Sequence, residues 1–265
     1  MPVALQKLKF FALDMDGTIY LGQKLLPGAK EFLEYLTASD RKYIFLTNNS
    51  SKNKQSYVNK LQALGLDATI DQILTSGEAT ALYLNSIKPN ARTFLLGTPD
   101  LEQEFIAHGF TLTASAPDFV VLGFDQTLSY AKLTEACHLI REGVPLIATH
   151  PDINCPTDER SGYIPDVGAM LELLYASTGQ RAKIIGKPYQ EIIDVLLTKL
   201  NCRREETAIV GDRLYTDIKL AENAAICGIL VLSGETKQTD LTNSEVKPDY
   251  VFANVRELTA SLQQK

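Results

Sequence analysis

The sequence predicts an α/β fold, with a mostly parallel sheet covered by helices and a smaller α/β unit inserted into the chain. Short apolar runs alternate with stretches in which apolar residues recur at helical spacing. This alternation occurs near both ends of the chain, and a separate series of predicted strands and helices lies between them. The chain has 265 residues, of which 45% are hydrophobic and 22% charged. That length can hold one large domain or a core with a smaller second domain.

The amino-terminal part is predicted to contain two strands, residues 10–13 and 43–46, each followed by a helix. Ser50 or Ser51 is expected to cap the second helix, and Gly65 is expected to end it. The apolar residues that define the two helices are Ala29, Phe32, Leu33 and Leu36, and then Tyr57, Val58, Leu61 and Leu64.

The carboxyl-terminal part continues in the same style. Pro188 is expected to open a helix through residues 192–200, because proline suits the first helical turn. A further helix is predicted through Ile218, Leu220 and Ala221. The predicted strands are residues 184–185, 208–210, 229–232 and 250–252.

The middle of the chain is predicted as a separate α/β unit at about residues 81–180, inserted into a core of residues 1–80 and 181–265. A long polar loop is expected at residues 149–165, followed by a helix through Met170, Leu171 and Leu174. The remaining predicted elements are strands at 94–96, 119–122 and 146–148 and a helix at 128–140.

The net charge of −6 and the pI near 5.2 argue against a nucleic-acid partner, which normally requires a basic face. No stretch predicts a signal peptide or a membrane span. The four cysteines are scattered without a Cys-x-x-Cys pair, as expected of structural thiols in a reducing compartment. We therefore expect a cytoplasmic, soluble protein, for which a small phosphorylated metabolite remains a suitable partner.

Polar clusters follow the predicted strands. Asp14 and Asp16 come directly after the first strand, and alternation along the chain places both carboxylates on one side, with Gly17 allowing a sharp turn. Two carboxylates so close together favour a bound cation or a shared proton. Because open α/β sheets bind ligands at the carboxyl ends of their strands, this position is a candidate site.

Three further clusters lie at strand ends or helix starts. Thr47 and Asn48 precede a helix, where hydroxyls and free backbone N–H groups suit an anion. Lys187 supplies a fixed cation, and Asp212 and Asp217 follow the strand at 208–210. Each cluster alone has an ordinary explanation, such as a turn or a helix cap. Together they supply hard oxygen ligands for Mg²⁺ and donors for phosphate oxygens, which phosphoryl transfer needs.

In this order, the motifs Asp14-x-Asp16-Gly17-Thr18, Thr47, Lys187 and Gly211-Asp212-x-x-x-x-Asp217 resemble those of haloacid dehalogenase (HAD) superfamily phosphatases. The resemblance covers nearly the whole chain and implies a Rossmann-like parallel-sheet HAD core with an inserted cap. The stretch between Thr47 and Lys187 is far longer than one crossover needs. It is similar to subclass IIA, with an α/β (C2a) cap, which includes p-nitrophenylphosphatases and nucleotide phosphatases. A homo-oligomer formed through the cap is compatible with this subclass.

The resemblance implies roles for these residues. Asp14 would attack phosphorus and form an aspartyl-phosphate, and Asp16 would protonate the leaving group and then activate water. Mg²⁺ would be held by Asp14, by the backbone carbonyl of Asp16 and by Asp212, with Asp217 in support. Thr47, the Asn48 backbone and Lys187 would hold the phosphoryl oxygens. The expected substrates are nucleotides, sugar phosphates or similar phosphomonoesters, with p-nitrophenyl phosphate as an artificial one.

The cap would select the substrate. The donor-rich loop that begins at His150 and Asp152 lies over the active site in this family, so both residues are candidate specificity residues; the alternative is a solvated loop with a turn at Asp152. A phosphotransferase or phosphomutase would use the same intermediate, but the stretch between Asp14 and Thr47 is too short for the helical cap usual in such mutases. A phosphoaspartate receiver would lack the cap and Asp16. A binding protein without turnover is disfavoured by the intact set of residues.

Overall fold

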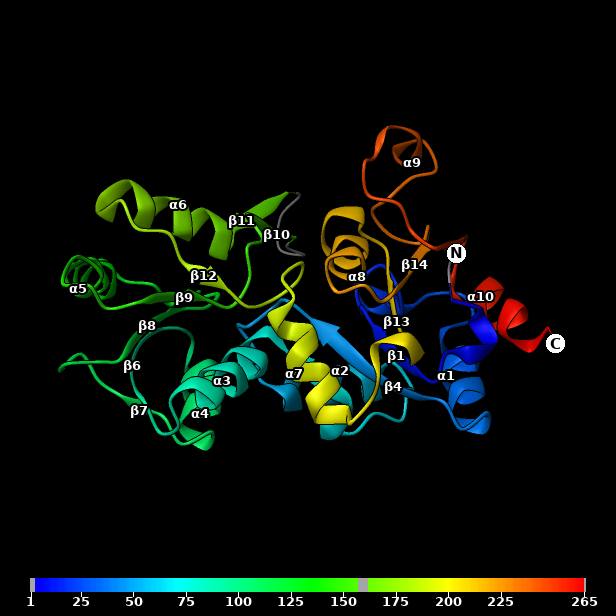
Figure 1. The fold of residues 1–265 in the computed structure, drawn as a ribbon, viewed down its shortest axis with the longest axis horizontal. Coiled ribbons are helices and arrows are strands. Elements are labelled where there is room, and N and C mark those ends of the chain that lie inside the picture. Colours follow the sequence, from blue (N-terminus) through cyan, green and yellow to red (C-terminus); the bar gives the residue numbers. More distant parts are fainter. Residues whose placement is uncertain (1–2, 157–161, 265) are drawn as a thin grey trace. The chain divides into compact units, whose positions relative to one another are not determined.

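The computed structural model describes residues 3–156 and 162–264, which form two compact units (Figure 1). The first unit contains Met1–Thr47, Tyr57–Leu74 and Leu196–Lys265. The second contains Asn48–Ser56 and Thr75–Val195. The predicted insert at 81–180 lies within the second unit, which extends further at both ends and also includes the short segment 48–56.

The first unit is built around a six-stranded sheet with the order β15-β14-β13-β1-β4-β5. Strand β1 is central and pairs in parallel with β13 and with β4, so that Leu13 lies opposite Val210 and Phe45. Strand β14 is parallel to both β13 and β15. The strands are β1 (Phe10–Leu13), β4 (Lys42–Thr47), β5 (Ile73–Thr75), β13 (Thr207–Gly211), β14 (Cys227–Val231) and β15 (Tyr250–Phe252), and a hairpin of β2 (Tyr20–Leu21) and β3 (Lys24–Leu25) follows β1.

Apolar side chains cover both faces of this sheet. Ile229 and Val231 belong to the larger core cluster, whereas Leu230 packs with the chain around Ile218 on the opposite face. Phe11 of β1 meets Phe32 edge to face at 6.2 Å between ring centroids. The helices are α1 (Ala29–Ala38), α2 (Lys54–Ala63), α7 (Glu191–Leu200), α8 (Lys219–Asn223), α9 (Asp240–Asn243) and α10 (Val255–Gln263), with 3₁₀ turns at Leu5–Lys7, Ile70–Gln72 and Arg204–Glu206 and one π-helical turn at Leu214–Ile218. The first residues of α2 and α7 belong to the second unit.

The second unit has its own sheet, with the order β12-β9-β8-β6-β7 and parallel pairing throughout. Thr75, Thr98 and Ser129 cap three of its helices by accepting a hydrogen bond from a backbone N–H. Its elements are β6 (Arg92–Leu96), β7 (Thr111–Leu112), β8 (Phe119–Leu122), β9 (Leu146–Ala148), β12 (Lys183–Ile184), α3 (Ser76–Ile87), α4 (Pro99–Ala107), α5 (Tyr130–Arg141) and α6 (Val167–Thr178), with a hairpin of β10 (Asn154–Pro156) and β11 (Tyr163–Pro165). The α/β class with parallel sheets is therefore confirmed.

Several element boundaries differ from the prediction. Asn53, not Ser50 or Ser51, accepts a hydrogen bond from Ser56 N (3.0 Å) in the first turn of α2. The expected helix at Pro188 begins later, at Glu191, because a turn closed by Tyr189 N and Gly186 O (2.9 Å) comes first.

Two further differences concern the second unit. The strand expected at 184–185 is Lys183–Ile184, and it joins the second sheet beside β9. The loop expected at 149–165 contains the hairpin β10–β11, and its residues 157–161 lie outside the described residues.

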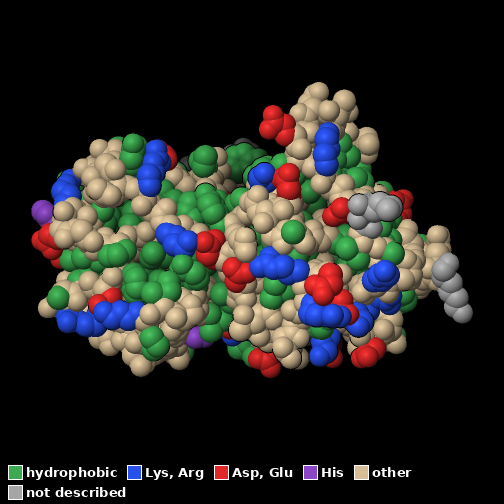
Figure 2. Space-filling view, viewed as in Figure 1, with side chains coloured by type: hydrophobic (Ala, Val, Ile, Leu, Met, Phe, Trp, Pro, Cys, Tyr) green, Lys and Arg blue, Asp and Glu red, His purple; other side chains and the backbone are tan. Residues whose placement is uncertain are grey.

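Charged side chains of both signs are mixed over the face seen in Figure 2. This mixture accompanies the modest net charge of −6. Among the described residues, no helix is both long and apolar enough to cross a membrane.

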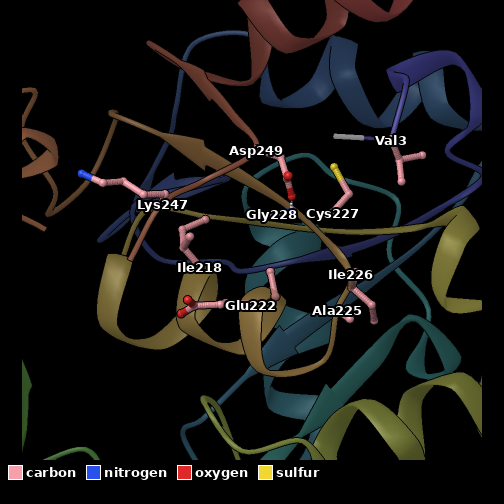
Figure 3. Close-up of a pocket in the computed structure, with 10 residues that line it drawn as sticks. Val3, Ile218, Glu222, Ala225, Ile226, Cys227, Gly228, Lys247 and Asp249 are labelled. Atoms are coloured by element: carbon pink, nitrogen blue, oxygen red, sulfur yellow. Dashed lines mark hydrogen bonds between the residues drawn. The ribbon is translucent and has the colours of Figure 1, made fainter. Parts of the chain in front are cut away.

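A pocket of about 280 Å³ opens at the amino-terminal edge of the first sheet, where β14 begins at Cys227 (Figure 3). Burial, and then the charge of Asp249, raise the pKa of the Cys227 thiol to about 12, so it stays protonated near neutral pH. Asp249 accepts a hydrogen bond from Gly228 N (2.8 Å). Because the carboxyl ends of the strands lie at the opposite edge, this pocket is separate from the polar strand ends described next.

Candidate active site

Three polar residues of the first unit follow neighbouring strands at one edge of the sheet. Asp14 follows β1, Asp212 follows β13, and Thr47 is the last residue of β4. Because β1 lies between β13 and β4 and all three run parallel, the register places these strand ends side by side. The backbone N–H of Asp14 donates to Val210 O (2.8 Å), which ties the two acidic strand ends together.

Asp14, Asp212 and Asp217 bring a carboxylate oxygen each to within 4.8 Å of the others. Asp212 and Asp217 are buried, whereas Asp14 is partly exposed. Asp217 reaches this position from the π-helical turn after β13, where it accepts a hydrogen bond from Arg213 N (3.2 Å). The predicted grouping of the first and last acidic motifs is thus present in the first unit.

Asp16 lies on the same loop but is exposed. The residue between the two aspartates, Met15, is 2% exposed and packs in the core, so alternation directs the carboxylates of Asp14 and Asp16 away from it. Gly17 then turns the chain with φ of +88°, and its N–H donates to Tyr20 O (2.7 Å). A Cβ atom at Gly17 would lie only 2.4 Å from Asp212 Oδ2, so this turn requires glycine.

The surroundings of Asp212 are poorly suited to a charged carboxylate without a cation. Its Oδ2 accepts from Glu235 N (2.6 Å), but its buried Oδ1 has no hydrogen-bond partner among the described residues. Burial, followed by the negative charges of Asp14 and Asp217, raises the pKa of Asp212 to about 8. An orphaned buried oxygen beside two further carboxylates is a set of hard oxygen donors that fits a divalent cation.

In the second unit, the side-chain amide of Asn48 is paired with the backbone of Lys187. Lys187 N donates to Asn48 Oδ1 (2.8 Å), and Asn48 Nδ2 donates to Lys187 O (2.9 Å). Both residues are buried. Gly186 permits this approach, because a Cβ atom there would lie 2.4 Å from Thr149 O and 2.7 Å from Asn48 Oδ1. Asn48 of the predicted anion motif and the predicted Lys187 are therefore in contact, through the side-chain amide of Asn48 and the backbone of Lys187.

His150 and Asp152 lie in the same unit. His150 is 0% exposed, with Nε2 3.0 Å from Asp166 Oδ1 and Nδ1 3.0 Å from Thr149 Oγ1 and 3.3 Å from Ser76 Oγ. Asp152 is partly exposed and accepts hydrogen bonds from Asn48 Nδ2 at 3.1 and 3.2 Å. The role of both residues in substrate selection stays a prediction.

Sequence reasoning missed the residues that hold this group in place. Ser76 Oγ donates to Asn48 O, and Asp166 accepts from Val167 N (2.7 Å) as it caps α6. The position of Asp166 directly before a helix indicates a cap, but nothing local indicates its contact with His150. Glu235, whose N–H binds Asp212, follows Gly234 in a polar stretch that gave no signal.

Comparisons with known proteins identify the family of the chain. The chain matches the model of haloacid dehalogenase-like hydrolases over residues 11–111 and a HAD-hydrolase-like model over residues 184–258. An acid sugar phosphatase of Staphylococcus aureus is 33% identical over 98% of this chain and 100% of its own length. The chain therefore belongs to the haloacid dehalogenase-like hydrolases, among the phosphatases of the subclass that carries an α/β cap.

Solved structures of this subclass are also similar. A 4-nitrophenylphosphatase from Thermotoga maritima is 49% identical, with 98% of this chain and 99% of the other covered and a TM-score of 0.94. A glycerol phosphate phosphatase from Mycobacterium tuberculosis, solved in complex with calcium, is 30% identical over 100% of this chain and 77% of its own, with a TM-score of 0.89.

Proposed function

We propose that this chain is a Mg²⁺-dependent phosphatase that hydrolyses small phosphomonoesters through an aspartyl-phosphate at Asp14. The observation that carries the proposal is the acidic group of Asp14, Asp212 and Asp217, two of them buried, at the strand ends of the first sheet. Sugar phosphates are the leading substrate class, since similar proteins are named acid sugar phosphatase and glycerol phosphate phosphatase. Nucleotides and related phosphomonoesters remain within the proposal.

The residues of the first unit have distinct proposed roles. The Asp14 carboxylate attacks phosphorus and forms a covalent bond as the bond to the leaving oxygen breaks. Asp16 gives that oxygen a proton and later accepts one from the attacking water. Its exposure in the structure leaves this carboxyl accessible for proton exchange with solvent. The resulting aspartyl-phosphate is hydrolysed to free Asp14 and inorganic phosphate.

The acidic group fits a divalent cation, and Mg²⁺ would be held by Asp14, the backbone carbonyl of Asp16 and Asp212, with Asp217 in support. When bound, Mg²⁺ supplies positive charge that offsets the charge of the phosphoryl oxygens. Thr47, the backbone of Asn48 and Lys187 are proposed to bind those oxygens. We also propose that catalysis belongs to the core at 1–80 and 181–265, and substrate selection to the cap at 81–180.

A phosphomutase or phosphotransferase would share the covalent step and differ in what accepts the phosphoryl group. The relatives reported above are named phosphatases and give that alternative no support.

The proposal predicts release of inorganic phosphate from p-nitrophenyl phosphate that requires Mg²⁺ and stops after removal of bound metal with EDTA. The same assay over a panel of sugar phosphates and nucleotides should show its highest kcat/KM among the sugar phosphates. Full activity in excess EDTA would contradict the metal requirement. Phosphoryl transfer to a second metabolite without phosphate release would contradict hydrolysis, and an absence of turnover on every ester would favour a binding protein.

A further inference from the structure

Both N–H donors of the Asn48 amide are used by neighbouring residues, and its oxygen already accepts one hydrogen bond. Its Oδ1 accepts from Lys187 N, and its Nδ2 donates both to Lys187 O and to Asp152. The backbone carbonyl of Asn48 accepts a further hydrogen bond from Ser76 Oγ. The side chain of Asn48, the residue directly after Thr47, therefore holds the backbone of Lys187 in place.

Asp152 reinforces the orientation of the Asn48 amide that the Lys187 backbone already favours. A carboxylate only accepts hydrogen bonds, so it requires the NH₂ end of the amide to face it. Both oxygens of Asp152 lie near Asn48 Nδ2, at 3.1 and 3.2 Å. In the same orientation the NH₂ end also donates to Lys187 O, at 2.9 Å, and the oxygen end faces Lys187 N, at 2.8 Å. Without Asp152, one amide hydrogen loses its acceptor and the flipped amide, which would face Lys187 N with a donor, is less strongly disfavoured.

Asp152 is itself held firmly at the start of α6. Gly168 N donates to Asp152 O (2.7 Å), and a Cβ atom at Gly168 would lie 2.2 Å from Pro151 O. The neighbouring His150 is 0% exposed and is held through Asp166, the cap of α6. Because Asp152 is fixed in this way, its hydrogen bonds restrict the position of Asn48, and the hydrogen bonds of Asn48 restrict the position of Lys187.

From these contacts we infer that Asp152 is a positioning residue, which helps to fix the Asn48 amide and through it the place of Lys187. This inference rests on the proposed function, because it gives Lys187 its part in binding the phosphoryl oxygens. It differs from the role in substrate selection predicted from the sequence. A residue that acts through Lys187 affects binding of the phosphoryl group, which all substrates share. A specificity residue affects only binding of the leaving group, which differs between substrates.

The test is kcat/KM of Asp152→Ala and Asp152→Asn on p-nitrophenyl phosphate and on the panel of sugar phosphates and nucleotides. Asp152→Ala should lose roughly 10- to 100-fold on every substrate alike, the cost of a misplaced binding group. Asp152→Asn keeps one acceptor oxygen for Asn48 and should recover most of that loss. Ile153→Ala, in the same loop but 62% exposed, is the matched control and should leave turnover of p-nitrophenyl phosphate unchanged.

A double-mutant cycle makes the test specific. In a Lys187→Met background, Asp152→Ala should cause almost no further loss, because the group through which it acts is gone. A full additional loss in that background, a change in the ranking of substrates, or equal losses for Asp152→Ala and Asp152→Asn would overturn the inference alone. Wild-type kcat/KM in Lys187→Met would overturn both the inference and the proposed role of Lys187. Thermal unfolding of each variant confirms that it is folded.

Discussion

Replacing Asp14 by asparagine is expected to reduce kcat on p-nitrophenyl phosphate by roughly 10⁴- to 10⁶-fold, the range seen when a covalent nucleophile is lost. The amide keeps the shape of the carboxylate but has neither its charge nor its nucleophilicity. The fold should survive, because Asp14 is only partly buried and its backbone N–H still donates to Val210 O.

Asp67→Asn is the matched control for this variant. Asp67 is an exposed aspartate of the same unit that lies outside the acidic group, and its substitution should leave kcat unchanged. Peptide mass analysis of the Asp14→Asn protein must show that the asparagine is intact, because deamidation would restore the nucleophile. A substantial fraction of wild-type kcat from the intact variant would rule out covalent catalysis by this residue.

The second large effect is expected for Asp212→Asn, which should lower Mg²⁺-dependent kcat/KM by roughly 10²- to 10⁴-fold. The substitution removes one negative charge from the three carboxylates that are proposed to bind the cation. In metal-free protein the same change should leave stability equal or raise it. The reason is that the wild-type carboxylate is buried beside Asp14 and Asp217, and its Oδ1 has no hydrogen-bond partner within the described part of the chain.

Thermal unfolding with EDTA and with excess Mg²⁺ separates these two effects. The wild-type protein should gain Tm on addition of Mg²⁺, since a ligand that binds only the folded state stabilises it. Asp212→Asn should show little or no gain, whereas Asp67→Asn should gain as much as the wild type. A full Mg²⁺-induced rise in Tm for Asp212→Asn would show that the cation binds elsewhere.

The neighbourhood of Asp14 and Asp212 could be predicted because it depends on a general property of parallel sheets. Strands of one sheet end at a common edge, so residues that follow two buried strands come together when those strands pair. Met15 also behaved as alternation requires, because it packs in the core while its two acidic neighbours point away from it. Asp217 was harder to place, since it reaches the group from a π-helical turn that the spacing did not predict.

Other features depended on contacts between residues far apart in the chain. Ser50 had the residue type and position of a helix cap, but its hydroxyl lies 2.9 Å from Thr149 Oγ1 and accepts from Phe124 N. The strand Lys183–Ile184 had no local sign of which sheet it would join, and it pairs with β9. Polar side chains have several alternative partners of similar strength, and tertiary packing decides among them.

The same reasoning explains why His150 was placed in a substrate-facing loop. A histidine beside Pro151 and Asp152 in a polar stretch has the composition of an exposed loop. Burial of His150 becomes favourable only because Asp166, Thr149 and Ser76 supply partners for both ring nitrogens. Asp166 and Ser76 come from two other segments of the chain, and their convergence on His150 is visible only in the folded unit.

Covalent catalysis by Asp14 is tested by looking for the aspartyl-phosphate itself. The wild-type protein would be mixed with Mg²⁺ and excess p-nitrophenyl phosphate, quenched in acid within the first turnover, and digested for mass spectrometry. The covalent mechanism predicts a peptide that carries one added phosphoryl group on Asp14, at a level that falls as the substrate is exhausted. Rapid release of inorganic phosphate with no modified Asp14 peptide at any quench time, or with the phosphoryl group on another residue, would contradict it.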